Sequence, residues 1–279
     1  EEGRKARALI EAARAEVARL VGAPAETVIF TSGGTEACNL ALGLRQAPAG
    51  EIKRLLVSAI EHSAVLAAAK ESGLPVEELP VTPDGVLDLD ALDAALADDT
   101  PALVCVMLAN NETGVIQPIA EVAAKTRAHG SLLFCDGVQA AGKIDINLFA
   151  LGVDALSLSG HKLGAPMGVG ALVTRPAVVV PPQLIGGGQE LGRRAGSENI
   201  SGIAAFAAAA RAAMRDLEAF ADLADRRDEM EAALQAAQAQ LVVYGKGAPR
   251  LANTSCFALS GLNAETLVMA MDLAGISVS

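Results

Sequence analysis

A lysine stands between small and polar residues directly after an apolar segment of the chain. It is Lys162, within Ser159-Gly160-His161-Lys162-Leu163-Gly164, and the apolar run covers residues 155–158. At the mouth of a buried strand a lysine loses part of its hydration, and its amine becomes free to form a Schiff base. This points to carbonyl or pyridoxal-phosphate chemistry, although most lysines are only solvated surface charges.

A glycine pair with hydroxyl-bearing neighbours joins a short apolar strand to a helical run. The turn is Thr31-Ser32-Gly33-Gly34-Thr35, and an Ala- and Leu-rich stretch follows it. Free N–H groups at such a helix start, together with the hydroxyls, would bind a phosphate. Taken alone, these residues are explained more simply by an ordinary capped turn. The turn has neither the Gly-Lys-Ser/Thr ending of a Walker loop nor a G-x-G-x-x-G pattern, so a nucleotide site is poorly supported.

Two further polar residues follow apolar strands, and each has a structural alternative. Asp136 ends the run Leu132-Leu133-Phe134-Cys135, where a protonated pyridine nitrogen would satisfy a buried carboxylate. Aspartates in this position also cap helices. His62 follows the strand near residue 57 and could stack on an aromatic cofactor or exchange protons, although a lone histidine is more often structural.

The elements that must position these residues alternate along the chain. Apolar strand candidates are separated mostly by Ala-rich helical segments, and they lie near residues 27–31, 53–58, 102–108, 131–135, 154–158 and 169–174. This alternation predicts an α/β fold with a mainly parallel sheet and helices on both faces. Ligands of such sheets bind outside the carboxyl ends of the strands, so the four segments are expected to meet in one crevice.

Composition excludes some classes of function and sets the size of the fold. With 279 residues, 52% of them hydrophobic, the chain can build a substantial core and a smaller appended unit. We expect residues 1–201 to form the large domain and residues 202–279 a linking helix and the start of a small α+β domain. A net charge of −11 argues against nucleic acid, and no apolar run is long enough to span a membrane. The four cysteines show no C-x-x-C or metal spacing, which predicts small buried side chains in a reducing cytoplasm and no metal site.

Six motifs in one order make the whole sequence similar to a known family. They are Thr-Ser-Gly-Gly-Thr-Glu (31–36), Glu-His-Ser (61–63), Asn-Asn-Glu-Thr-Gly (110–114), Asp-Gly-Val-Gln (136–139), Ser-Gly-His-Lys (159–162) and Arg-Ala-Gly-Ser-Glu-Asn (194–199). The chain closely resembles cysteine desulfurases of the NifS/IscS type, in the class V aminotransferase group of fold-type I pyridoxal-phosphate enzymes. The resemblance implies a large cofactor domain, a smaller C-terminal domain and a homodimer.

The resemblance also implies a role for each matching position. Lys162 would hold pyridoxal 5'-phosphate and remove the Cα proton of L-cysteine, with His62 against the ring face. The other implied contacts are Gly34, Thr35, Ser159 and His161 for the phosphate, Asp136 for the pyridine nitrogen, Gln139 for the ring hydroxyl and Asn111 for the ring and substrate side. Ser197, where the family commonly has threonine, would reach the phosphate of the partner subunit.

The implied reaction converts L-cysteine to L-alanine and passes the sulfur, as an enzyme persulfide, to an acceptor such as an iron–sulfur scaffold or a tRNA-modifying protein. We expect the persulfide cysteine just beyond Ser279 and the substrate-binding arginine further on, so that the small domain is incomplete in these residues. Two alternatives stay open. One is another class V enzyme, such as a selenocysteine lyase or a small-amino-acid aminotransferase, and the other is a non-catalytic scaffold that keeps the fold.

Overall fold

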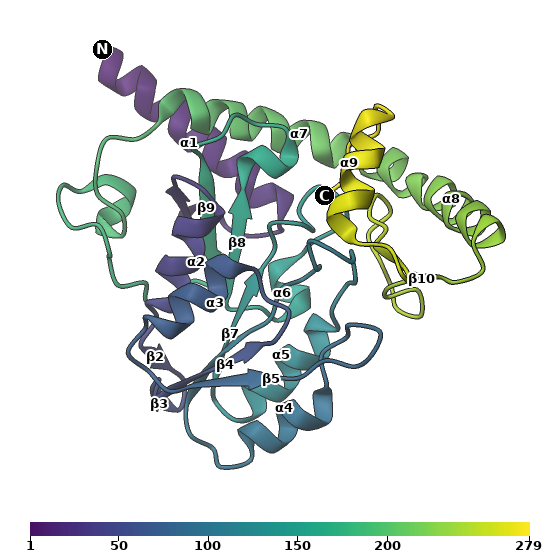
Figure 1. The fold of residues 1–279 in the computed structure, drawn as a ribbon. Helices are drawn as coiled ribbons and strands as arrows, with labels where there is room; N and C mark the ends of the chain where they lie inside the picture. Colours follow the sequence, from purple (N-terminus) through teal and green to yellow (C-terminus); the bar gives the residue numbers. More distant parts are fainter.

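The computed structural model covers residues 1–279 and is organised around one seven-stranded sheet (Figure 1). In the order in which they lie side by side, its strands are β1 (Val28–Thr31), β9 (Gly170–Thr174), β8 (Ala155–Ser159), β7 (Leu132–Asp136), β6 (Ala102–Cys105), β4 (Arg54–Ser58) and β5 (Val76–Leu79). All six strands expected from the sequence are present. The edge strand β5 was not among them, because three of its four residues are exposed and its two glutamates hide the apolar signal.

Strand direction decides where functional residues can meet. Strands β4 to β8 pair in parallel, whereas β9 pairs antiparallel with both β8 and β1. Strand β1 therefore runs in the same direction as β8, and the prediction of a mainly parallel sheet is confirmed. The carboxyl ends of β1, β4, β7 and β8 consequently share one edge of the sheet.

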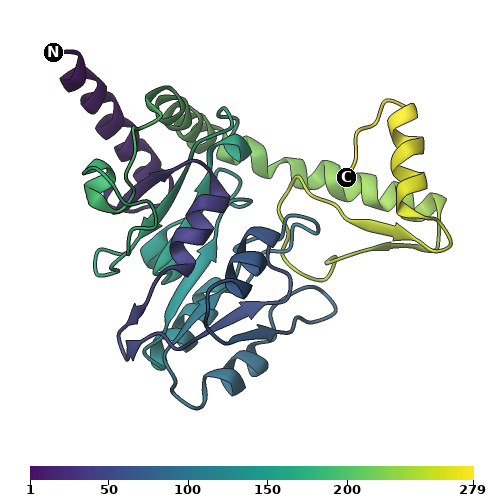
Figure 2. The ribbon, with the colours of Figure 1, turned by 60° about the vertical axis from the view of Figure 1, so that its left-hand side comes forward.

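Helices cover both faces, because alternate strand residues point to opposite sides. One face carries α1 (Glu2–Leu20), α4 (Leu89–Leu96), α5 (Ile119–Ala128), α6 (Leu148–Leu151) and α7 (Ile200–Ala221), and the other carries α2 (Gly34–Leu42) and α3 (Ser63–Lys70). Along β7, Leu133 and Cys135 belong to the first core, and Leu132 and Phe134 to the second. Helices α1 and α7 lie side by side although they are far apart in sequence (Figures 1 and 2).

A smaller unit follows α7. It comprises α8 (Leu223–Ala237), the antiparallel strands β10 (Leu241–Val243) and β11 (Phe257–Leu259), and α9 (Ala264–Leu273), and it lies at the far end of α7 from the start of the chain (Figure 2). Backbone hydrogen bonds join it to the segment that carries the Asn-Asn-Glu-Thr-Gly motif: Ile116 donates to Pro249, and Leu251 to Gly114, both at 2.8 Å. The remaining elements are the short pair β2 (Gln46–Ala47) and β3 (Gly50–Glu51), and the single turns η1 (Ala25–Thr27), η2 (Gly160–Leu163) and η3 (Gln189–Gly192). None of the helices combines the length and apolar character required to cross a lipid bilayer.

Candidate active site

A cavity of about 270 Å³ lies at the edge of the sheet where β1, β4, β7 and β8 end. It is lined by Gly34, Thr35, Cys38, His62, Ala64, Met107, Ala109, Asn111, Asp136, Val138, Gln139, Ser159, His161 and Lys162. Nine of the ten site residues expected from the sequence are in this set, and the tenth, Ser197, is not. The topology of the sheet thus brings together residues of five of the six motifs, from Gly34 to Lys162.

Helix α2 begins at the cavity without a side-chain cap. Its N-cap is Gly33, which has no side chain to accept from the first N–H groups, and those groups have no partner within the helix. Gly34 and Thr35, in the first turn, line the cavity. The open helix start is therefore available to an anion.

The turn before α2 packs directly on the sheet through Gly170. This residue begins β9 and is in register with Thr31 and Ser159. A Cβ atom at Gly170 would lie 2.5 Å from the carbonyl carbon of Gly33 and 2.7 Å from the carbonyl oxygen of Leu158. Both neighbours are backbone atoms, which cannot rotate away, so only glycine fits here.

Gly170→Ala is therefore expected to destabilise the protein by about 1–3 kcal/mol, as overpacking does, and to displace the turn at Gly33. Urea denaturation measures this loss. Gly188→Ala is a matched control, because Gly188 has an ordinary φ of −86° and nothing within 4 Å of the added methyl. Equal unfolding midpoints for Gly170→Ala and the wild type would contradict the packing described.

Asp136 is a buried carboxylate that forms no salt bridge in the chain, although His62 lies near enough to lower its pKa slightly against the effect of burial. Its Oδ1 accepts from the Ser157 hydroxyl at 2.8 Å and from the Val138 N–H at 3.0 Å, and the Cys38 Sγ lies 3.9 Å from Oδ2. Burial raises the pKa of Asp136, and these hydrogen bonds only partly oppose that effect. A positively charged group in the cavity would lower the cost of the buried anion.

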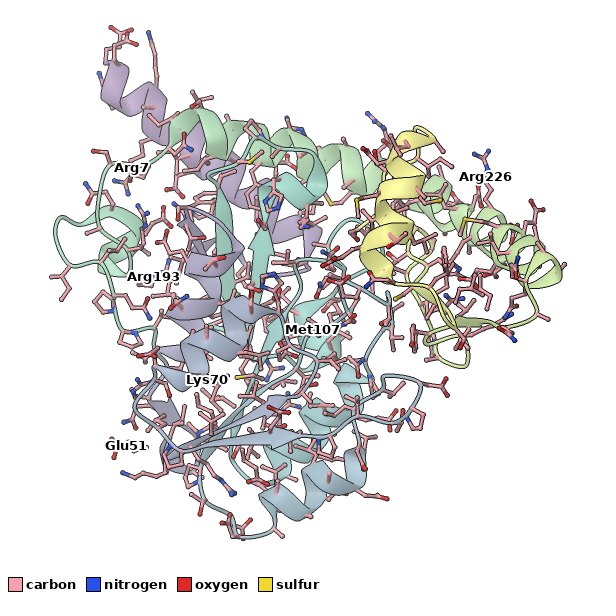
Figure 3. All side chains as sticks on the ribbon, viewed as in Figure 1. Arg7, Glu51, Lys70, Met107, Arg193 and Arg226 are labelled. Atoms are coloured by element: carbon pink, nitrogen blue, oxygen red, sulfur yellow. The ribbon has the colours of Figure 1, made fainter.

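Glu61 is a second buried carboxyl group beside the same cavity. Its Oε1 accepts from the Met107 N–H at 2.6 Å, and its Oε2 has no partner. Met107 is central in the molecule, whereas Arg7, Glu51 and Arg226 lie toward its edges (Figure 3). Burial, and then the charge of Asp136, raises the pKa of Glu61 well above its ordinary value. Of the two buried carboxyl groups, Glu61 is therefore the one whose protonated form is favoured the more strongly.

Lys162 lies in η2, the single turn that follows β8. Its side chain lines the cavity and has no ionic or hydrogen-bonding partner. The partial burial expected from the sequence is not found in the single chain, because η2 turns out of the sheet and the cavity is open to solvent. Next to it, the Ser159 Oγ and the His161 Nδ1 lie 2.9 Å apart.

His62 has the structural role considered from the sequence, and its ring also lies at the cavity. Its Nδ1 accepts from the Ala64 N–H at 3.0 Å, which caps α3, and its ring lines the cavity. Because Nδ1 is an acceptor in this bond, the ring is held in place and a neutral imidazole carries its proton on Nε2. The cap on α3 therefore fixes the orientation of the ring at the wall of the cavity.

Three contributors to the site were not foreseen. Cys38 was expected to be only a small buried side chain; it is buried, but it also contacts Asp136 from α2, one turn after Gly34. Ser157, two residues before Ser159 on β8, points to the same side of the sheet. Lys143 donates to the Gln139 Oε1 at 2.9 Å, and burial, with Lys162 nearby, lowers the pKa of Lys143. The spacing along the sequence could have identified them. Cys38 is one helical turn after Gly34, Ser157 is two strand residues before Ser159, and Lys143 is four residues after Gln139.

Asn111 and Ser197 complete the set of expected residues. Asn111 reaches the cavity from the loop after β6, where its Nδ2 donates to the Glu112 Oε1 at 2.6 Å. Ser197 is exposed in the loop between β9 and α7 and lines a separate hollow with Ser32 and Arg194. Within one chain, Ser197 therefore does not reach the cavity that contains Asp136.

The fold and the cavity define a site for an anionic aromatic ligand with a carbonyl group: an open helix start, a buried carboxylate and a free lysine amine. The chain belongs to the family described as "Aminotransferase class-V", whose sequence model matches residues 1–279. Members of this family depend on pyridoxal phosphate.

Individual relatives carry narrower names. The chain is 39% identical over 273 residues to "Cysteine desulfurase 2" of Trichormus variabilis, covering 97% of this chain and 68% of that protein. The solved structure of a NifS-like protein from Rickettsia africae superposes with a TM-score of 0.92 at 31% identity, over all of this chain and 78% of the other. A structure described as SspA in complex with cysteine matches with a TM-score of 0.84 at 27% identity, over 100% of this chain and 78% of that chain.

The residues present fit pyridoxal phosphate. Asp136 is buried without a salt bridge, which a protonated pyridine nitrogen would provide, and the start of α2 has no side-chain cap, so a phosphate could bind there. Lys162 has no partner that would compete for its amine. The cavity volume is just below the range of about 300–1,000 Å³ that is typical of small-ligand sites, which suits a single compact ring.

Proposed function

We propose that this protein is a pyridoxal-phosphate-dependent cysteine desulfurase, which removes sulfur from L-cysteine and leaves L-alanine. The observation that carries the proposal is the convergence of Lys162, Asp136 and the start of α2 on one cavity. The identity with a protein named cysteine desulfurase and the fold shared with a cysteine-bound protein support the choice of substrate.

In the proposed mechanism, the cofactor supplies a protonated ring that accepts the electron pair released at the substrate Cα. Asp136 would hold the ring nitrogen and keep it protonated, because its carboxylate is buried and forms no salt bridge within the chain. Lys162, whose side chain lines the cavity without a partner, would bind the cofactor and would move the Cα proton of cysteine. Ser157 and Cys38 keep the Asp136 carboxylate in place.

The other cavity residues bind and orient. The N–H groups at Gly34 and Thr35, with the paired Ser159 and His161 side chains, would hold the phosphate. His62, fixed by its cap on α3, would lie against the ring and donate a proton from Nε2. Gln139 would hold the ring hydroxyl, and Asn111 the substrate side of the ring.

The proposal extends to the partners of the enzyme. The protein acts as a homodimer in which Ser197 of each subunit contacts the phosphate of the other, which accounts for its exposed position outside its own cavity. Sulfur leaves as an enzyme persulfide for an acceptor such as an iron–sulfur scaffold protein. Four free cysteines, three of them buried, agree with a cytoplasmic location. Residues 1–201 form the cofactor domain, and residues 202–279 the linking helix and the small domain.

Product analysis tests the activity. Incubation of the purified protein with pyridoxal phosphate, L-cysteine and a thiol reductant is expected to yield alanine and sulfide in equal amounts. Selenide from selenocysteine without turnover of cysteine would identify a selenocysteine lyase, and a keto acid would identify an aminotransferase. A colourless protein that binds no cofactor would favour a non-catalytic scaffold and overturn the proposal.

Asp136→Asn is expected to lower kcat for L-cysteine by about 10²-fold while the protein stays folded, because the amide cannot stabilise a protonated ring nitrogen. Steady-state alanine formation measures this, and the absorption spectrum confirms that cofactor is bound. Asp93→Asn, on an exposed helix face where Asp93 pairs with Lys125, is the matched control and should keep wild-type kcat. Unchanged turnover in Asp136→Asn would contradict the assigned role.

A further inference from the structure

The phosphate-binding turn is joined to the loop that carries Ser197 by an ion pair within the same subunit. The Arg194 Nε donates to the Glu36 Oε1 at 2.7 Å, and the Arg194 Nη2 donates to the Glu36 Oε2 at 3.1 Å. The two residues are 158 positions apart, and both side chains are about one-fifth exposed. A bidentate pair of this geometry fixes distance as well as orientation.

Glu36 also determines the shape of the turn itself. It lies in the first turn of α2, and its Oε2 accepts from the Ser32 N–H at 2.7 Å. Burial opposes ionisation of Glu36, but hydrogen bonds from Arg194 and Ser32 hold its pKa below the ordinary value. Glu36 is therefore negatively charged at neutral pH and holds the turn and the loop at once.

The charge of Glu36 has a consequence for an anionic ligand. A carboxylate in the first turn of α2 repels a phosphate bound at the start of the same helix, in a region only partly open to water. The guanidinium of Arg194 offsets this charge while it is paired. Removal of Arg194 alone would leave the carboxylate uncompensated beside the phosphate site.

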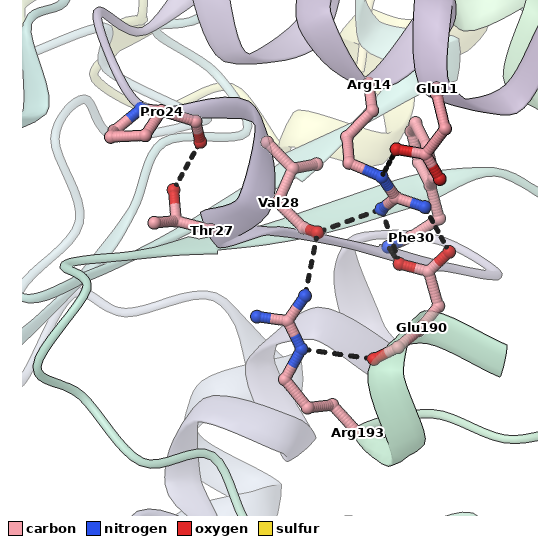
Figure 4. A network of polar contacts seen from close by, with 8 residues as sticks. All are labelled: Glu11, Arg14, Pro24, Thr27, Val28, Phe30, Glu190 and Arg193. Carbon is pink, nitrogen blue, oxygen red and sulfur yellow. Dashed lines mark hydrogen bonds and ion pairs between the residues drawn. The ribbon is translucent and has the colours of Figure 1, made fainter. Parts of the chain in front are cut away.

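The loop is held at a second point just before Arg194. The Glu190 carboxylate binds Arg14 of α1 and the Phe30 N–H of β1, and Arg193 donates to the Val28 and Glu190 carbonyl oxygens (Figure 4). Ser197 lies in the loop between these anchors and α7, three residues after Arg194, and its side chain is exposed. The position of Ser197 is thus determined by contacts within its own subunit.

We propose that Arg194 and Glu36 are positioning residues that couple cofactor binding to dimerisation. The proposal rests on the proposed function, in which the turn holds the phosphate and Ser197 serves the partner subunit. A phosphate that orders the turn orders Glu36 and Arg194, and through them the loop presented to the partner. By thermodynamic linkage, the dimer then binds the cofactor more tightly than the monomer does, by the same factor by which the cofactor strengthens the dimer.

A double-mutant cycle tests the coupling with Arg194→Gln, Glu36→Gln and the double variant. The dissociation constant of pyridoxal phosphate is measured by absorbance, and the dimer dissociation constant by sedimentation with and without the cofactor. Arg194→Gln should weaken cofactor binding about 10-fold and reduce the effect of cofactor on the dimer by a similar factor. The double variant should regain part of the cofactor affinity, since no carboxylate is left unpaired, but not the coupling.

Arg215→Gln provides the control, because Arg215 pairs with the adjacent Asp216 on an exposed face of α7. It should match the wild type in both constants. Wild-type cofactor affinity and wild-type cofactor dependence of the dimer in Arg194→Gln would overturn the proposal. If Arg194→Gln fails to fold, the same two constants are measured on the double variant. A wild-type effect of the cofactor on the dimer dissociation constant of the double variant would likewise overturn the proposal.

Inorganic phosphate, used as a second probe on the cofactor-free dimer, separates this proposal from the proposed function. Failure of the wild type to bind pyridoxal phosphate would overturn the proposed function. A dimer that phosphate still tightens, with the effect lost in Arg194→Gln, would support the coupling even then. A dimer that neither phosphate nor the cofactor tightens would overturn it.

Discussion

Lys162→Ala is expected to lower kcat for L-cysteine by about 10⁴-fold or more, since one side chain both binds the cofactor and moves the substrate proton. The methyl group of alanine can do neither, and no other lysine lines the cavity. Alanine formation at saturating cysteine measures the loss. The fold should persist, because Lys162 makes no ion pair or hydrogen bond within the protein.

Borohydride reduction distinguishes loss of the reactive amine from loss of the site. Reduction of the wild-type holoenzyme followed by peptide mapping should place the pyridoxyl group on Lys162, and the same treatment of Lys162→Ala should label no lysine. Lys125→Ala, which removes a lysine that pairs with Asp93 on the surface, is the control and should be labelled as the wild type is. An adduct on a different lysine in the wild-type protein would refute the assignment.

Glu190→Gln is expected to destabilise the protein by about 3–5 kcal/mol, because it leaves the buried Arg14 guanidinium with only the half-exposed Glu11, 3.2 Å away, as a counter-charge. The Arg14 and Glu190 side chains are 8% and 2% exposed, and two bonds of 2.6 and 2.8 Å join them. Arg14 also donates to the Val28 carbonyl oxygen and lies 4.8 Å from the centre of the Phe30 ring (Figure 4). Chemical denaturation measures the change in unfolding free energy.

Backbone conformation adds to this effect. Glu190 and Leu191 have φ values of 48° and 57°, a left-handed conformation that non-glycine residues adopt only when the surroundings impose it. The ion pair with Arg14 is what holds this turn against α1 and β1. A variant in which both charged residues are replaced by apolar ones, Arg14→Met with Glu190→Leu, should be more stable than Glu190→Gln, since no charge stays buried.

An exposed pair provides the matched comparison. Lys53 and Glu51 form an ion pair on the surface, with both side chains more than half exposed. Glu51→Gln should leave the unfolding midpoint unchanged, because water screens such a pair. A midpoint for Glu190→Gln as high as that of the wild type would show that the buried pair does not hold the loop.

Local sequence patterns predicted most of the fold. Each interior strand is a short apolar run, as in Ala102–Cys105, and such runs are recognisable because both faces of the sheet are covered. The edge strand β5 was missed because Glu77 and Glu78 face solvent there. The single antiparallel strand β9 was also beyond sequence reasoning, since strand direction depends on the path of the chain between strands.

Sequence reasoning alone determined that a lysine, an aspartate, a histidine and an open helix start each follow a strand, and that strand ends of a parallel sheet meet. Proximity in the chain and strand periodicity are enough for that, and the residues of these segments line one cavity. Asn111, Gln139, Ser159 and His161, which the family resemblance implied, line the same cavity, whereas Ser197 does not. Tertiary structure alone decided which distant charges meet: Glu61 beside Asp136, Arg14 with Glu190, and Arg194 with Glu36. These pairs join segments tens to more than a hundred residues apart, and their energies come from burial and the order of strands in the sheet, neither of which is encoded in any local stretch of residues.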